Sequence, residues 1–259
     1  MNDDSKRELA KLLAALRRER RQQSGLQNHL VPPTEPLAYE VARLVEVELA
    51  KPVLGWKVAA MKEEMQRQLR AHSPIYGRVF DVFDSPAAVD FETSCSPIPE
   101  VEYQAVLGHD LPPRASPYTR DEVVDAVASM HPGLELAECR FVHDERFPPL
   151  AAILADGAGS GAVVLGPAIE NWRDRDLAGQ EVVLRCNGQA RRQGTARAAL
   201  DHPIEPLVWL ANELSRTGIG LKAGQVVSTG TLTGMLRPRQ GDVYTADYGE
   251  FGTVSVTYR

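Results

Sequence analysis

Two glutamates, Glu100 and Glu102, stand two positions apart in a stretch where polar and apolar residues alternate, 98–107. Residues i and i+2 of a β-strand point to the same face, so we expect both carboxylates to project together, followed by Gln104. Burying neighbouring carboxylates costs several kcal/mol unless a cation neutralises them. The pair therefore predicts either a solvent-facing edge strand or a cation-binding site.

A third carboxylate, that of Glu135, lies between two leucines in a predicted core strand over residues 134–142. Its side chain can alternate to the wet face of that strand, and Glu138 and Arg140 follow at i+3 and i+5. Three carboxylates without histidine or cysteine partners favour a hard cation such as Mg²⁺ or Mn²⁺ over Zn²⁺. The residue types therefore allow a divalent-metal site.

Other catalytic patterns are missing. The six histidines form no HxxxH or HxH pattern, and neither a GxSxG elbow nor a Cys–His pair can be read. Residues 229–234, Thr-Gly-Thr-Leu-Thr-Gly, follow a predicted strand and offer hydroxyl and backbone N–H donors that suit a carboxylate. This loop lacks the lysine of a phosphate-binding loop, which argues against nucleotide binding.

The first 50 residues predict two helices ahead of the main body. The first helix carries an apolar stripe at helical spacing, Leu9, Leu12, Leu13 and Leu16, and the second is predicted over residues 36–50. The first helix is followed by four cations, Arg17, Arg18, Arg20 and Arg21. We interpret them as a solvated last turn, with basic contact to a partner as the alternative.

From residue 53 onward the pattern changes to short strands with few helices. Strands are predicted at 53–60, 224–229, 241–248 and 252–258, and the Asn187-Gly188 turn predicts a hairpin over 181–194. Helices are predicted after the Thr119–Glu122 capping box, with Val127 and Met130 behind it, and over residues 203–216. This order favours a mixed, β-rich α+β domain over a doubly wound parallel sheet.

Two apolar segments are interpreted separately. Residues 147–169 contain Asp156, glycines and prolines, so we predict two buried strands around a turn rather than a membrane span. A short helix after the strand at 53–60 carries Met61, Met65 and Leu69 at helical spacing. We expect these methionines to fill the core.

Composition excludes several classes of protein. The 259 residues carry a formal net charge of −6, which argues against a nucleic-acid partner. Three widely spaced cysteines form no CxxC pair and indicate a reducing compartment. The N-terminal residues are charged and lack the apolar stretch of a signal peptide, so we expect a cytoplasmic protein with no membrane contact.

Six motifs occur in order along the chain: GWKVAA (55–60), PEVEYQAVLGHDL (99–111), LELAECRF (134–141), ADGAGSGAVVLG (155–166), HPIEPLVWLANEL (202–214) and STGTLTGM (228–235). Together they resemble the 2-keto-4-pentenoate hydratase and 4-oxalocrotonate decarboxylase branch of the fumarylacetoacetase-like superfamily. The resemblance spans nearly the whole chain. Each motif alone is weak, and their shared order is what makes them specific.

The resemblance implies an α+β, β-rich fumarylacetoacetase-like fold, a mixed rolled sheet or barrel. An N-terminal helical layer (1–52) is expected to precede a catalytic domain (53–259). The resemblance implies that Glu100, Glu102 and Glu135 hold Mg²⁺ or Mn²⁺. It implies catalytic roles for Lys57, Glu138 and Arg140, and substrate binding by Asp156, Ser160, Thr229 and Thr231.

Two departures from the family pattern bear on activity. The family's D-N-A-S-S segment reads Asp-Gly-Ala-Gly-Ser at 156–160, so only Ser160 remains there as a hydroxyl donor. Hydratases of this branch often read P-D-[FY]-G where this chain has Pro-Ile-Tyr-Gly at 74–77. Ile75 cannot move a proton, and the segment looks more like the decarboxylase side.

The function implied is that of a metal-dependent lyase acting on a 2-oxo or 2-hydroxydienoic acid through a metal-bound enolate. The first expectation is a 2-keto-4-pentenoate (2-hydroxypenta-2,4-dienoate) hydratase in the catabolism of aromatic-derived acids. The alternatives are a 4-oxalocrotonate-type decarboxylase, a related C–C hydrolase or tautomerase, and a non-enzymatic homologue. Family members assemble, so a homo-oligomer, a dimer or larger, is expected.

Overall fold

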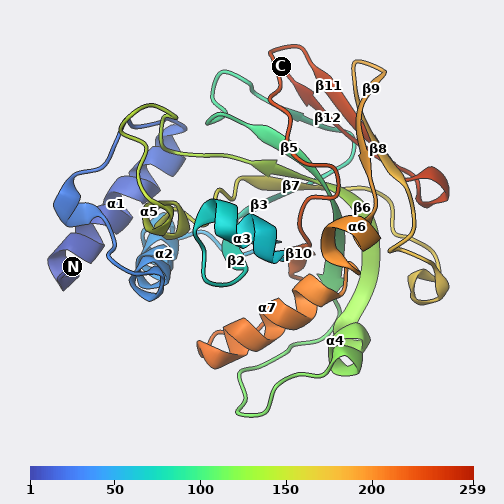
Figure 1. Ribbon diagram of the computed structural model, residues 1–259, viewed down its shortest axis with the longest axis horizontal. Helices are drawn as coiled ribbons and strands as arrows, with labels where there is room; N and C mark the ends of the chain where they lie inside the picture. Colours follow the sequence, from blue (N-terminus) through green and yellow to red (C-terminus); the bar gives the residue numbers. More distant parts are fainter.

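The computed structural model describes the whole chain, residues 1–259. Its strands form two sheets (Figure 1). The seven-stranded sheet has the order β2 (Ile75–Val79), β1 (Gly55–Ala59), β10 (Val226–Ser228), β5 (Ile98–Leu107), β6 (Val127–Ala137), β7 (Ala162–Leu165) and β3 (Asp81–Asp84). The five-stranded sheet has the order β4 (Ala87–Val89), β12 (Thr253–Tyr258), β11 (Val243–Asp247), β8 (Val182–Cys186) and β9 (Gln189–Gly194).

Helices flank the two sheets. They are α1 (Asp3–Glu19), α2 (Glu35–Leu49), α3 (Glu63–Leu69), α4 (Arg120–Ala126), α5 (Leu150–Ala155), α6 (Ala196–Leu200) and α7 (Glu205–Arg216), with single 3₁₀ turns at Asn28–Leu30, Trp172–Asp174 and Gly249–Phe251. The α1 and α2 helices lie together at one side of the molecule with α5 (Figure 1). None of the helices has both the length and the apolar composition needed to span a bilayer.

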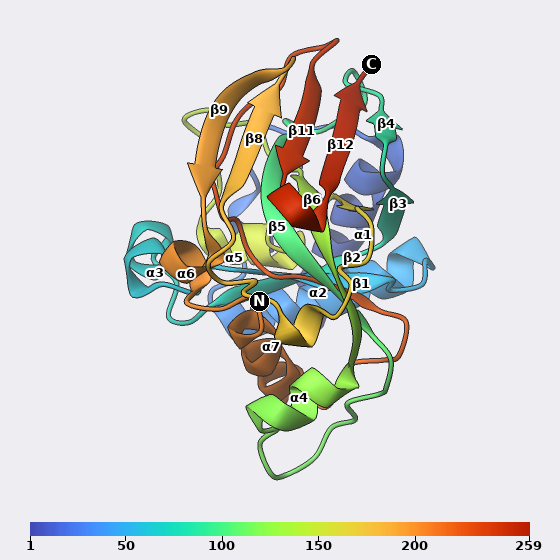
Figure 2. The same cartoon turned by 90° about the vertical axis from the view of Figure 1, so that its right-hand side faces the viewer.

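The larger hydrophobic core takes residues from both sheets, and in Figure 2 strands β8, β11 and β12 lie in front of β5 and β6. Alternate residues of β5, such as Val101 and Tyr103, face this core. There the ring of Tyr103 packs edge-on against that of Tyr248, with 5.3 Å between the ring centroids. The intervening residues of β5 therefore point to the opposite face of the seven-stranded sheet. Glu100, Glu102 and Gln104 belong to that second face.

The seven-stranded sheet is strongly curled around this second face. Val79 of β2, Val163 of β7 and Val226 of β10 pack in one apolar cluster, although four strands separate β2 from β7 in the sheet. A flat sheet would hold these side chains far apart, because neighbouring strands are about 4.8 Å apart. The second face is therefore the concave inside of a rolled sheet, and its polar residues are shielded from water.

The helical layer shares a separate hydrophobic core with the main body. Leu9 and Leu13 of α1 and Val41 of α2 are buried together with Leu154 of α5 and Phe141. This core contains residues from both sides of residue 52. The division into a helical layer and a catalytic domain at that residue stays a prediction.

Most of the predicted elements are present, with α1, α2, the 182–194 hairpin, α7 and the last strands near their expected bounds. The strand predicted at residues 150–155 is wrong, because these residues form the helix α5. Their sequence, Leu-Ala-Ala-Ile-Leu-Ala, is rich in strong helix formers, and a short buried helix and a buried strand share the same apolar pattern. The capping box of Thr119 and Glu122 is confirmed.

Three further expectations were wrong. The capped helix ends at Ala126, and residues 127–137 form β6, so Met130 lies in a strand that pairs along the length of β5. Met61 packs against the larger core as expected, but Met65 does not fill it, because α3 buries no residue and Met65 is 38% exposed. Arg17 is not solvated, since only 11% of its side chain is exposed and it pairs with Asp156.

Candidate active site

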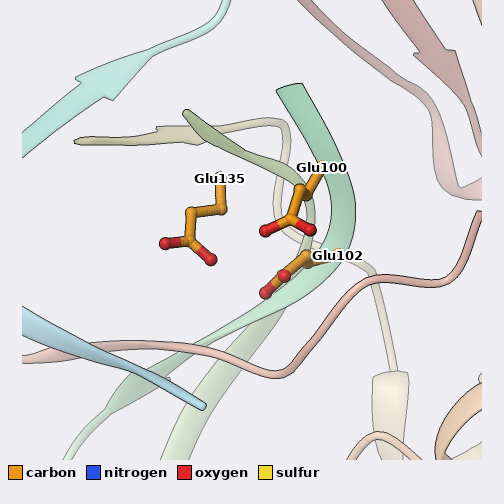
Figure 3. Close-up of side chains that lie close together, drawn as sticks. All are labelled: Glu100, Glu102 and Glu135. Atoms are coloured by element: carbon orange, nitrogen blue, oxygen red, sulfur yellow. The ribbon is translucent and has the colours of Figure 1, made fainter. Parts of the chain in front are cut away.

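Three carboxylates meet on the concave face of the rolled sheet (Figure 3). Strands β5 and β6 are antiparallel with Glu100 directly opposite Glu135, and Glu102 follows on the same face of β5. One oxygen of each carboxylate lies within 4.8 Å of the others, and all three residues are buried. The edge-strand alternative is therefore wrong, because β5 is the central strand of its sheet.

Hydrogen bonds orient the carboxylate of Glu102. Its Oε2 accepts the hydroxyl of Ser228 and, at 2.8 Å, the backbone N–H of Gly230. The side-chain amide of Gln104 in turn donates to Ser228 Oγ at 2.8 Å. Gly230 has φ of +107°, a conformation that favours glycine, so the loop can turn its N–H toward Glu102.

A second glycine makes room for Gln104. A side chain at Gly133, on the neighbouring strand, would place its Cβ only 2.1 Å from Gln104 Cγ. Gln104 is completely buried, and its Oε1 has no hydrogen-bond partner. The missing side chain at residue 133 thus allows an amide to lie beside Ser228 and Glu102.

The amine of Lys57 is the cation of this cluster. Strand β1 lies parallel to β10 with Lys57 opposite Ser228, and the Lys57 Nζ is 3.5 Å from Glu135 Oε2. Burial favours the neutral amine, but the surrounding carboxylates outweigh it and raise the pKa of Lys57. Lys57 is therefore a charged residue although it is buried, with only 4% of its surface exposed.

The cluster fits a divalent cation that prefers oxygen ligands. Three carboxylates and one ammonium leave two uncompensated negative charges in a buried site, which is unfavourable without a counter-ion. Burial and mutual repulsion raise the pKa of Glu102, and burial raises that of Glu135, whose two oxygens have no hydrogen-bond partner. A span of 4.8 Å matches the roughly 4–5 Å between opposite oxygen ligands of Mg²⁺ or Ca²⁺.

The predicted hydroxyl-rich loop lies next to Glu102. Thr229 donates its backbone N–H to the Tyr103 carbonyl at 3.2 Å, and its buried Oγ1 has no hydrogen-bond partner. Thr231 is partly buried and donates weakly to the Gly234 carbonyl at 3.4 Å. The loop therefore contacts Glu102 through the Gly230 N–H, and its Thr229 hydroxyl is left without a partner.

The other predicted site residues form a second buried cluster. Arg140 is 1% exposed and donates to Asp156 Oδ2 at 2.7 Å, while Arg17 donates to Asp156 Oδ1 at 3.2 Å. Glu138 lies 3.4 Å from Arg140, and the Ser160 hydroxyl donates to the backbone carbonyl of residue 78 at 2.6 Å. No hydrogen bond or ion pair joins this second cluster to the three carboxylates.

Sequence reasoning missed two contributors to the first cluster and one to the second. Ser228 was visible as the residue before the threonine loop, but its bond to Glu102 depends on strand pairing. Gly230 needed a backbone angle that the sequence does not display. The role of Arg17 was not predicted, because an arginine in the last turn of a helix is normally exposed and its partner Asp156 is 139 residues away.

Comparison with known proteins places these observations in context. A model of the family described as "Fumarylacetoacetate (FAA) hydrolase C-terminal" matches residues 86–258. The chain is 30% identical over 214 residues to the 2-keto-4-pentenoate hydratase of Paraburkholderia xenovorans, covering 82% of this chain and 78% of that enzyme. It is 28% identical over 223 residues to the 4-oxalocrotonate decarboxylase of Pseudomonas putida, covering 86% and 83%.

A solved structure supports the fold along the whole chain. The 4-oxalocrotonate decarboxylase from Pseudomonas putida G7, complexed with magnesium and adipate, has a TM-score of 0.89 to this chain at 23% sequence identity. The match covers 100% of this chain and 99% of that one. The rolled, β-rich α+β fold with helices at its N-terminus is thereby confirmed.

Proposed function

The chain belongs to the fumarylacetoacetate hydrolase family, and we propose that it is a divalent-metal-dependent 2-keto-4-pentenoate hydratase or a closely related lyase of 2-oxo and 2-hydroxydienoic acids. The lyase class rests on the relatives, because hydratases and decarboxylases are both lyases. The observation that carries the proposal is the buried trio of Glu100, Glu102 and Glu135 facing Lys57.

The three glutamates would hold Mg²⁺ or Mn²⁺. When bound, the cation supplies Lewis-acid stabilisation of the negative charge that develops on the 2-oxygen of the substrate. Ser228 and the Gly230 N–H keep Glu102 in a fixed orientation, and preorganised ligands of this kind lower the cost of reaching the transition state.

We assign proton handling to Lys57 and carboxylate binding to the threonine loop. Lys57 Nζ carries a proton 3.5 Å from Glu135, and the shielded position beside the cation site suits transfer of that proton to the reacting substrate. Thr229 has a buried hydroxyl without a partner, and Thr231 follows on the same loop. We assign both hydroxyls to donate to the substrate carboxylate.

We assign positioning roles to the second cluster. Arg140 donates to the carboxylate of Asp156 and to the Ser160 carbonyl at 2.8 Å, so it fixes both ends of the 156–160 turn. The contacts of Glu138 also end within this cluster. Their roles in catalysis and substrate binding, implied by the family resemblance, stay predictions.

A decarboxylase is the second candidate, favoured by Ile75. This residue is 5% exposed at the start of β2, opposite Ala59 of β1, which lies two residues beyond Lys57. An isoleucine there supplies no group that could deliver water, whereas loss of carbon dioxide needs no such group. The chain therefore retains the residues for enolate formation without an acid at the position where related hydratases often carry one.

One experiment separates the two candidates. Purified protein with Mg²⁺, or separately Mn²⁺, is incubated with 2-hydroxypenta-2,4-dienoate in H₂¹⁸O and with 4-oxalocrotonate, and products are followed by mass spectrometry. Incorporation of ¹⁸O at C4 supports the hydratase, and release of carbon dioxide supports the decarboxylase. Absence of both reactions with both metals, in protein shown to bind Mg²⁺, would contradict the proposed function.

A further inference from the structure

A large cavity lies on the opposite face of β6 from the three carboxylates. Leu136 contributes to its wall, whereas the preceding residue, Glu135, points to the concave face, since successive side chains of a strand alternate. The cavity has a volume of about 420 Å³ and shares no lining residue with the carboxylates, Lys57 or the threonine loop. We propose that it binds a small dicarboxylate with an apolar middle, at a site separate from the candidate active site.

The charge of the wall favours a dianion. Five cations line the cavity against two carboxylates, those of Asp81 and Glu138. Asp156, which lies behind the wall and pairs with Arg17 and Arg140, neutralises one further charge. The net charge near the cavity is therefore +2, which a dicarboxylate matches.

Two of these cations have no acidic partner. Lys51 pairs with Asp81 at 3.2 Å, but neither Arg18 nor Arg20 forms an ion pair. Arg18 donates only to the backbone carbonyl of Glu48, and both side chains are exposed. A single guanidinium binds a carboxylate through two parallel hydrogen bonds, so either arginine can take one end of the ligand.

A buried hydroxyl and an apolar wall suit the rest of the ligand. Tyr258 lines the cavity, is completely buried, and its hydroxyl has no hydrogen-bond partner. Phe80, Phe83 and Leu136 supply apolar surface, and the cavity volume lies within the roughly 300–1,000 Å³ typical of small-molecule sites. An inorganic anion would leave this apolar surface and the Tyr258 hydroxyl unused.

A matched pair of ligands tests the charge of the occupant. trans,trans-Muconate and sorbate share a conjugated six-carbon chain, but sorbate has only one carboxylate. We expect isothermal titration calorimetry of the full-length protein in EDTA to show saturable 1:1 binding of muconate, about tenfold tighter than sorbate, as one charge-assisted contact is worth roughly this factor. Equal affinity for the two acids would overturn the proposal, and so would competition by sulfate at the same concentration.

Variants test the location of the site. The double substitution Arg18→Ala/Arg20→Ala is expected to abolish the preference for muconate, whereas Lys11→Ala, an exposed α1 residue away from the cavity, retains it. Tyr258→Phe keeps the buried ring, removes a hydroxyl that has no partner in the protein, and is expected to weaken muconate binding. Unchanged binding in the double variant would overturn the location, and unchanged binding in Tyr258→Phe would overturn the role of the hydroxyl.

Glu102→Gln distinguishes this cavity from the candidate active site. We expect the variant to bind muconate in EDTA with the affinity of the unmodified protein, since Glu102 does not line the cavity. A changed affinity, in either direction, would show that muconate occupies the active site and would overturn the proposal. Because these measurements need neither metal nor turnover, they are independent of whether the proposed lyase activity is found.

Discussion

The molecule buries two clusters of charged side chains, and they differ in how completely they are satisfied. The first cluster, Glu100, Glu102, Glu135 and Lys57, has a formal net charge of −2 when all four groups are ionised, and both oxygens of Glu135 lack hydrogen bonds. The second cluster, Arg17, Arg140, Asp156 and Glu138, is neutral, and each oxygen of Asp156 pairs with an arginine.

The difference separates a site that needs a ligand from one that is complete. A buried charge is tolerated only when partners compensate it, so an uncompensated cluster requires something that the chain does not supply. A compensated cluster holds elements together. Here the second cluster connects α1 to the end of α5 and to the segment after β6. Its members Arg17 and Asp156 are 139 residues apart in sequence.

The largest expected effect comes from Glu102→Gln. Loss of one ligand charge should lower turnover with Mg²⁺ on the order of a thousandfold, because Lewis-acid stabilisation is worth several kcal/mol and each 1.4 kcal/mol is a factor of ten. Steady-state kinetics and Mg²⁺ titration calorimetry measure the loss. Glu92→Gln, at an exposed position, is the control. Full activity in Glu102→Gln would remove the basis for distinguishing the clusters.

Asp156→Asn should act on stability instead. It leaves Arg17 buried without a counter-charge and leaves Arg140 with Glu138 alone, and breaking a buried pair lowers the free energy of unfolding by about 3 kcal/mol. Urea denaturation measures this loss, with Glu250→Gln at an exposed ion pair as the control. kcat and KM per folded molecule should stay unchanged. A raised KM would show that Asp156 contacts substrate, as the family resemblance implies.

Metal binding should stabilise the folded protein, and it should do so through the first cluster only. At a Mg²⁺ concentration of 100 Kd, the free energy of unfolding should rise by about 2.7 kcal/mol relative to protein in EDTA, because the cation binds the folded state. The increase should vanish in Glu102→Gln and persist in Asp156→Asn. Denaturation curves with and without Mg²⁺ measure it, and an increase that survives in Glu102→Gln would place the cation elsewhere.

The sequence predicted the two clusters unequally, for physical reasons. Glu100 and Glu102 share a face by strand geometry alone, and residue types suggested Glu135 as a third ligand. The pairing of Glu100 with Glu135 depends on the register of β5 and β6, which no local pattern displays. The partnership of Arg17 with Asp156 joins distant segments and left no local pattern. Local rules found most elements, whereas long-range contacts decided which charges are compensated.

The smallest effect is expected for Glu138→Gln. Glu138 is the outermost member of the compensated cluster, with 19% of its side chain exposed beside the large cavity and 3.4 Å separating it from Arg140. Its backbone N–H bond to the Gly159 carbonyl at 2.8 Å does not depend on the side chain.

We therefore expect the free energy of unfolding of Glu138→Gln to change by less than about 1 kcal/mol, because solvent screens the lost charge. Activity should not change, since the only ion pair of the side chain is with Arg140. Denaturation and steady-state kinetics on one preparation test both statements. If turnover fell while stability held, Glu138 would belong to the reaction, and a fully compensated cluster could no longer be read as purely structural.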